Sequence, residues 1–146
     1  MSTAVSFATT AHIRDACLCL HAQRAARALG RRFDDALRPL GLTSGQFSLL
    51  MALNRPEPAA MSAVARLLAM DRTTLTAALK VLERRGLATV AVDPEDRRGR
   101  RLSLTEAGRA GLAAAVPVWR ATHAAVEATL GGVDADMLRT GLRALA

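Results

Sequence analysis

The chain has 146 residues, of which 51% are hydrophobic, and a formal net charge of +7 from 20 basic and 13 acidic residues. It has the size of one domain, and its charge favours a polyanionic partner, either nucleic acid or an anionic membrane. No apolar run approaches the ~20 residues of a membrane span, and the chain does not begin with a basic and then apolar segment, so we expect neither a membrane helix nor a secretory signal. Two cysteines, Cys17 and Cys19, are too few for a disulfide framework, which favours the cytoplasm.

Two helices are predicted in the first part of the chain. Apolar residues recur at three or four positions between residues 10 and 37, which indicates one long amphipathic helix that ends before Pro39. Thr43 and Gln46 then have the spacing of a capping box, so a second helix is expected to begin there. The segment 54–60, NRPEPAA, has the composition of a loop.

Two shorter helices follow, each preceded by a residue suited to cap it. Ser62 is expected to cap the third helix. Three residues of that helix are expected to face the core: Val64, Leu67 and Leu68. Asp71 is expected to cap the fourth helix, which Gly86 terminates. Two short helices joined by a turn indicate a helix-turn-helix.

The hydrophobic pattern then changes from helical to alternating. Val90 and Val92 fall on one face of a short strand, and Leu102 and Leu104 alternate with polar residues after the turn DPEDRRG. Together these segments predict a two-stranded ribbon.

The last 42 residues are again predicted to be helical. From Thr105 onward, one long helix carries a stripe with the spacing of a coiled coil: Leu112, Val116, Trp119, His123, Val126 and Leu130. Pro117 lies inside this helix and is expected to kink it. Asp134 is expected to cap a last helix with Leu138, Leu142 and Leu145. The terminal helices are more apolar than solitary surface helices need to be, so a symmetric dimer is expected.

The fourth helix has two unlike faces. At about 100° per residue, Leu75, Leu79 and Leu82 fall on one apolar arc. The opposite arc carries hydroxyls first and cations later: Thr73, Thr76, Ala77, Lys80 and Arg84. Hydroxyls suit close approach to base edges and cations suit phosphates, although an ordinary solvated helix would show the same pattern.

The turn of the ribbon favours DNA binding over that alternative. It carries four arginines: Arg97, Arg98, Arg100 and Arg101. Concentrating like charge costs free energy unless a polyanion relieves it, and an arginine on a protruding turn can enter a narrow minor groove. Asp96, two residues before Arg98, is in place to hold that guanidinium in one pose.

These segments resemble the multiple antibiotic resistance regulator (MarR) family of winged-helix transcription factors. The resemblance covers about residues 17–119 and is carried by GLTSGQFSLLMAL, MDRTTLTAALKVLERRGL and DPEDRRGRRLSLTEAG. It fits a mainly α fold with a small two- to three-stranded β wing. It implies an obligate homodimer built from the long terminal helices, a palindromic operator, and repression relieved by a small ligand or by thiol oxidation.

Carried over residue by residue, the resemblance places the expected DNA contacts. Arg72, Thr73, Thr76 and Lys80 match positions of the recognition helix, and Asp96 and Arg98 match the wing pair; Arg84 and Arg100 complete the predicted set. Ala77 departs from the family pattern and offers only apolar contact. The predicted lobes are an N-terminal dimerisation helix (1–42), a DNA-binding lobe (43–104) and C-terminal dimerisation helices (105–146) within one compact chain. Expected partners are an operator duplex, a second copy of the chain and a small-molecule effector, with no cofactor and no metal.

Six residues are candidates for sensing: Cys17, Cys19, His21, Arg24, Trp119 and His123. On an intact helix, residues two apart point about 200° away from each other, so Cys17 and Cys19 neither share one metal ion nor form a disulfide without distortion. Four possibilities remain open: thiol sensing, a metal site in which Cys17 and His21 share a helix face and further ligands come from elsewhere, a ligand pocket in which Trp119, His21 and Arg24 hold an aromatic carboxylate, and simple packing.

Two other classes of protein are weighed against a regulator. A thiol peroxidase would use Cys17 or Cys19, but the sequence contains no Ser/His/Asp set, carboxylate pair, phosphate loop or metal motif. A winged-helix module that binds protein has no need of a polycationic tip. The prediction is therefore a non-enzymatic repressor.

Overall fold

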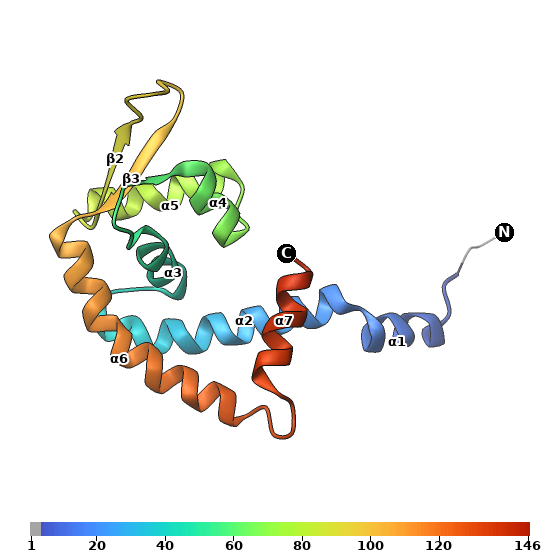
Figure 1. The fold of residues 1–146 in the computed structure, drawn as a ribbon. Helices are drawn as coiled ribbons and strands as arrows, with labels where there is room; N and C mark the ends of the chain where they lie inside the picture. Colours follow the sequence, from blue (N-terminus) through green and yellow to red (C-terminus); the bar gives the residue numbers. More distant parts are fainter. Residues whose placement is uncertain (1–3) are drawn as a thin grey trace.

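The computed structural model describes residues 4–146, which form a mostly helical molecule with one small sheet (Figure 1). The helices are α1 (Phe7–Ala16), α2 (Leu18–Leu37), the 3-10 turn η1 (Arg38–Leu40), α3 (Ser44–Leu53), α4 (Met61–Leu68), α5 (Arg72–Arg84), α6 (Glu106–Ala128) and α7 (Ala135–Ala144). The strands are β1 (Ala59–Ala60), β2 (Ala88–Val92) and β3 (Arg100–Leu104), antiparallel in the order β1-β3-β2. The predicted winged-helix fold class is confirmed. Residues 1–3, which open the predicted segment 1–42, lie outside the described residues.

The buried core belongs to α3, α4, α5 and the sheet, with the end of α2 and the start of α6 closing one side. The largest fully buried side chains are Leu37, Leu50, Val64, Leu75, Leu79, Leu82 and Leu102. By contrast, α1 and α7 bury no residue, and α1 extends away from the rest of the molecule (Figure 1). These two helices therefore present apolar surface that nothing covers within residues 4–146. No helix of that part of the chain is long and apolar enough to cross a membrane.

The first helix differs from the prediction, because it is interrupted at Cys17. That residue has an extended backbone, with φ −71° and ψ 109°, and ends α1 while beginning α2. Its thiol accepts the N–H of Leu20 at 3.4 Å, and its carbonyl lies 2.8 Å from Nδ1 of His21. The side chain of Cys17 therefore takes the place of a serine or aspartate N-cap, in a stretch without glycine or proline.

Two starts of helices show which capping predictions hold. At α3, the Thr43 hydroxyl accepts the N–H of Gln46 and the Gln46 side chain accepts the N–H of Thr43, both at 3.1 Å, so the capping box is confirmed. At α4 the prediction is wrong, since Ala60 rather than Ser62 is the N-cap. Ala60 pairs with β3 as part of β1, and the helix begins directly after this strand. The expected inward position of Leu67 is also wrong, as it is 53% exposed.

The later elements follow the sequence more closely. Gly86 ends α5 with a φ of +72°, and Thr105 and Asp134 cap α6 and α7. The helix α6 continues through Pro117 and is curved over its length (Figure 1). At its start, the Thr105 hydroxyl donates to the Gly86 carbonyl at 2.6 Å, which fixes α6 to the end of α5.

Candidate nucleic-acid interface

The recognition helix α5 presents the face that the sequence predicts. Leu75, Leu79 and Leu82 are buried, whereas Lys80 and Arg84 are exposed. Asp71 caps the helix by accepting the N–H of Thr74 at 2.8 Å and its hydroxyl at 2.7 Å. These hydrogen bonds, the backbone one first, hold the pKa of the Asp71 carboxyl below its usual range. The start of α5 is thereby fixed, with Arg72 and Thr73 exposed on its first turn.

The hydroxyl of Thr76 is used inside the helix. It donates to the carbonyl of Arg72 at 2.7 Å, so its hydrogen does not point toward a ligand. Its oxygen can still accept a hydrogen bond. Thr73, one position after Arg72, makes no side-chain hydrogen bond within residues 4–146. Its hydroxyl can therefore both donate and accept a hydrogen bond.

Two of the four wing arginines hold the turn itself. Arg101 forms an ion pair with Asp93 at 3.0 Å, and the Asp93 side chain is only 13% exposed. Nη1 of Arg100 donates to the carbonyls of Arg97 at 3.2 Å and Gly99 at 3.0 Å. The guanidinium of Arg100, predicted to contact DNA, is thus engaged by its own turn in this structure.

The expected contact of Asp96 with the Arg98 guanidinium is not formed. Instead, the Asp96 carboxylate accepts the backbone N–H of Arg98 at 3.0 Å, and its carbonyl accepts the N–H of Gly99 at 2.9 Å. Asp96 therefore shapes the backbone of the tip. The guanidiniums of Arg97 and Arg98 have no partner within residues 4–146. Arg97, which is not in the predicted set of DNA contacts, therefore joins the candidate interface.

The wing and the recognition helix are joined directly. Nη2 of Arg72 donates to the carbonyl of Arg98 at 3.3 Å, across 26 residues of sequence. This contact sets the spacing between the first turn of α5 and the tip of the wing. No local sequence pattern indicates it, because it depends on how the folded ribbon leans toward α5.

The candidate sensing residues fall into two separate places. Cys17, Cys19, His21 and Arg24 lie at the start of α2, all exposed except Cys17, which is half-buried. No group of three or more histidine, cysteine or acidic residues within residues 4–146 could hold a metal ion. Trp119 lies in a different site. Within residues 4–146 the cavity that Trp119 lines therefore includes neither His21 nor Arg24.

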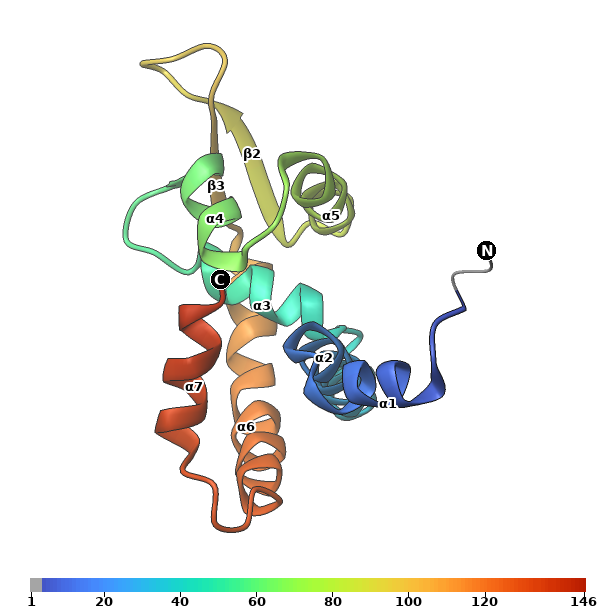
Figure 2. The ribbon, with the colours of Figure 1, turned by 90° about the vertical axis from the view of Figure 1, so that its right-hand side faces the viewer.

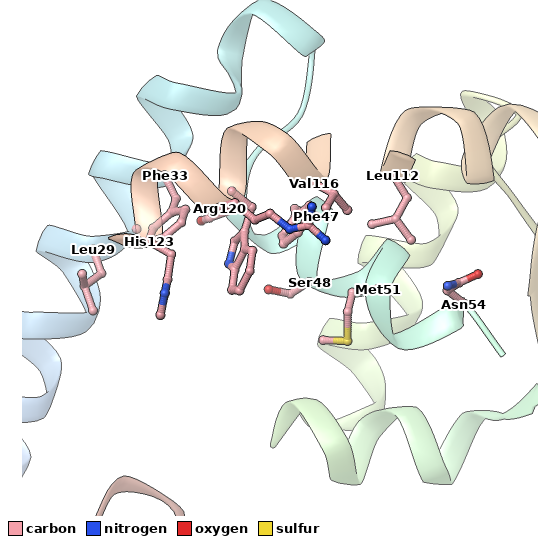
Figure 3. Close-up of a pocket in the computed structure, with 13 residues that line it drawn as sticks. Leu29, Phe33, Phe47, Ser48, Met51, Asn54, Leu112, Val116, Arg120 and His123 are labelled. Atoms are coloured by element: carbon pink, nitrogen blue, oxygen red, sulfur yellow. The ribbon is translucent and has the colours of Figure 1, made fainter. Parts of the chain in front are cut away.

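Trp119 and His123 line an open cavity of about 720 Å³ between α2, α3 and α6 (Figure 3). The rings of Trp119 and His123 stack with centroids 4.9 Å apart, and Phe47 continues the stack at 6.5 Å from Trp119. Most of the wall is apolar, and its polar groups include Ser48 and Arg120. The cavity can hold a flat apolar molecule that carries a negative charge.

Comparisons with known proteins agree with this architecture. A family model described as MarR family matches residues 40–99. The crystal structure of the M. tuberculosis transcriptional regulator MosR in complex with DNA is 43% identical, with a TM-score of 0.80, and the match covers 88% of this chain and 92% of that chain.

Two curated relatives match over a shorter stretch. The transcriptional activatory protein BadR of Rhodopseudomonas palustris is 38% identical over 77 residues, which are 51% of this chain and 44% of BadR. The transcriptional repressor NicR of Pseudomonas putida is 34% identical over 94 residues, 64% of this chain and 58% of NicR. The chain thus spans about half the length of the curated relatives it matches. Its fold is that of a winged-helix transcriptional regulator. The chain belongs to the MarR family.

Proposed function

We propose that the protein is a sequence-specific DNA-binding regulator that represses nearby genes from a palindromic operator. The observation that carries this proposal is the joined wing and recognition helix. Within residues 4–146 the guanidiniums of Arg97 and Arg98 have no partner at the tip, and Arg72 fixes that tip to the start of α5. Such an arrangement suits a helix in the major groove with a cationic wing in the adjacent minor groove. We propose repression, as the name of NicR states, rather than activation, as the name of BadR states.

A gel shift with the DNA upstream of the protein's own coding sequence tests the proposal. We expect a retarded complex at a concentration at which a scrambled duplex stays free, and a footprint with two-fold symmetry. Equal affinity for both duplexes would contradict sequence-specific binding. A reporter gene downstream of the protected segment should be expressed less when the protein is present, and increased expression would replace repression by activation.

A symmetric homodimer is part of this proposal, since one protomer can read only one half of a palindrome. Exposed apolar residues on the terminal helices support it, with Phe7 81%, Ile13 54% and Met137 76% exposed. We expect sedimentation to give twice the 15.4 kDa of one chain at micromolar concentration. A stable monomer would contradict the dimer.

We further propose that oxidation of Cys17 and Cys19 weakens DNA binding. Support comes from the interruption of the helix at Cys17, because the expected obstacle, an intact helix holding the two thiols apart, is absent there. A peroxide would take two electrons and two protons from the thiols, giving one disulfide and water. The disulfide would withdraw the Cys17 thiol from the N–H of Leu20 and uncap α2.

Serine variants give a clean test of thiol sensing. Cys17→Ser keeps an oxygen that can cap α2, so the reduced variant should bind DNA like the original protein, as should Cys19→Ser. On peroxide treatment, we expect DNA release by the original protein only, restored by a dithiol reductant. If a variant that carries both serine substitutions still releases DNA with peroxide, these thiols are not the sensor.

The cavity between α2, α3 and α6 supports a second way to release DNA. We propose that it binds a planar aromatic carboxylate, whose ring packs against the stacked rings of His123, Trp119 and Phe47 and whose charge meets Arg120. Since Trp119 is the chain's only tryptophan, benzoate and naphthoate titrations should change its fluorescence directly. Arg120→Gln should lower the affinity obtained from these titrations about tenfold or more, as expected for loss of a charge-assisted hydrogen bond. An equal response of the variant would remove Arg120 from the site.

A further inference from the structure

Three arginines recur at intervals of three and four residues along α2 and remain exposed: Arg24, Arg27 and Arg31. We call them the α2 arginine row. At about 100° per residue their mean direction lies about 130° from that of Phe33 and Leu37. Leu37 is fully buried and Phe33 lines the cavity formed with α3 and α6. The row therefore lies on the outer side of α2.

The charge of the row is not neutralised within residues 4–146. No carboxylate there lies within ion-pair distance of Arg24, Arg27 or Arg31. The two acidic residues of α2 are engaged elsewhere. Asp35 pairs with Arg38 at 2.6 Å, and Asp34 accepts the N–H of Ser44 at 2.6 Å. Like charges three or four residues apart destabilise a helix, and a bound polyanion would relieve that repulsion.

The helix α2, which carries the row, lies on the same side of the molecule as the recognition helix. In Figure 2, α2 and α5 occupy one side, whereas α4, α6 and α7 occupy the other. The inner side of α2 contacts α3 and α6, so the row on its outer side is turned away from these two helices. The cations Lys80 and Arg84 of α5 are exposed as well. A duplex bound to α5 can therefore extend past α2.

We propose that the α2 arginine row binds DNA phosphates in the segment between the two half-sites of the operator. This inference rests on the proposed function and adds a third DNA-contacting element to α5 and the wing. The half-sites of a dimer lie about 34–36 Å apart, and α2 leads from the DNA-binding lobe toward the terminal helices. The two rows then lie over central base pairs that neither recognition helix reaches. Guanidiniums bind phosphates in a bidentate manner, which adds affinity without reading sequence.

The first test compares two triple variants with the same loss of charge. One replaces the row by glutamine (R24Q, R27Q, R31Q), and the matched control replaces three exposed arginines on other elements (R55Q, R109Q, R143Q). The probe is a 30-bp duplex of upstream DNA that the protein protects in a footprint. For the row variant we expect the slope of log affinity against log salt to become shallower by about 0.9 for each lost contact. Equal changes for both variants would show an effect of net charge and overturn the proposal.

The second test removes charge from the DNA instead of the protein. Methylphosphonates replace the central phosphates of the same duplex and leave the half-sites unchanged. The original protein should lose affinity for this duplex, and the row variant should lose almost none, because it no longer makes those contacts. A lysine variant (R24K, R27K, R31K), which keeps the charge, should behave like the original protein, and the methylphosphonate result stands even if the glutamine variant folds poorly.

The outcomes separate this inference from the function on which it rests. If the original protein binds no upstream duplex, the proposed function fails and the inference with it. If it binds but the methylphosphonates have no effect, only the inference is overturned. Dissociation of the dimer by the glutamine substitutions, measured by sedimentation without DNA, would place the row in the interface between two copies and also overturn it.

Discussion

Gly108→Ala should be the most destabilising substitution of a single small residue in this protein. A methyl group at this position would overlap the carbonyl oxygen of Leu87 and would lie 3.0 Å from its carbonyl carbon. That carbonyl cannot turn aside freely, because it accepts the N–H of Thr105 at 3.1 Å. The start of α6 must therefore separate from the chain that enters β2. We expect the free energy of unfolding to fall by about 3 kcal/mol or more, at the upper end of overpacking effects.

Gly111→Ala, three residues further along α6, is the matched control. Nothing lies within 4 Å of a methyl group built there. Alanine should therefore stabilise the helix by about 0.5–1 kcal/mol. Urea unfolding, followed by circular dichroism and by Trp119 fluorescence, measures both variants. Equal stability of Gly108→Ala and the original protein would mean that α6 does not need its close approach to Leu87.

Features that depend on residues a few positions apart could be predicted from the sequence. The capping box of Thr43 and Gln46 and the cap of Asp71 are interactions over three residues, so the sequence contains all of their parts. The start of α4 could not be predicted in this way. Ala60 is extended because β1 pairs with β3 some 40 residues later, with Ala60 opposite Arg101. Long-range strand pairing overrode the local preference of Ser62 for an N-cap position.

The interruption at Cys17 shows a different reason for failure. The stretch contains neither glycine nor proline, and its apolar spacing continues through the break, so periodicity alone indicates one helix. Cysteine is seldom considered as an N-cap, yet its sulfur accepts the N–H of Leu20 here. Because α2 begins only at Leu18, the 200° separation of the two thiols expected on an intact helix does not apply to Cys17.

The exposed face of the recognition helix could be predicted from the sequence, but the interaction partners of the wing arginines could not. The exposed arc of α5 follows from its period, because Leu75, Leu79 and Leu82 must be buried together. The four wing arginines, however, are equivalent in sequence. The folded turn distinguishes them: Arg100 donates to backbone carbonyls and Arg101 pairs with Asp93, whereas the guanidiniums of Arg97 and Arg98 have no partner in the described part of the chain.

Because the four wing arginines have different partners, we expect their substitutions to affect DNA binding differently. Replacing Arg97 and Arg98 by alanine should remove two DNA contacts from each protomer, four from a dimer. Affinity should fall on the order of 100-fold or more for operator and unrelated DNA alike, and the salt slope should become shallower by about 3.6. Arg101→Ala instead breaks the ion pair with Asp93. It should weaken binding by loosening the turn, with almost no change in the salt slope.

Asp96→Ala distinguishes wing shape from net charge, because the two predict opposite signs. The substitution removes one negative charge and so makes the protein more basic, which by charge alone would tighten binding to DNA. It also removes the acceptor of the Arg98 N–H at 3.0 Å, leaving the tip free to adopt other backbone conformations. We expect weaker binding, because Arg98 must then be ordered when it enters the groove. Salt titrations on operator and scrambled duplexes measure all three variants. Tighter binding by Asp96→Ala, or an unchanged salt slope for the Arg97 and Arg98 double variant, would show that the tip does not contact the DNA.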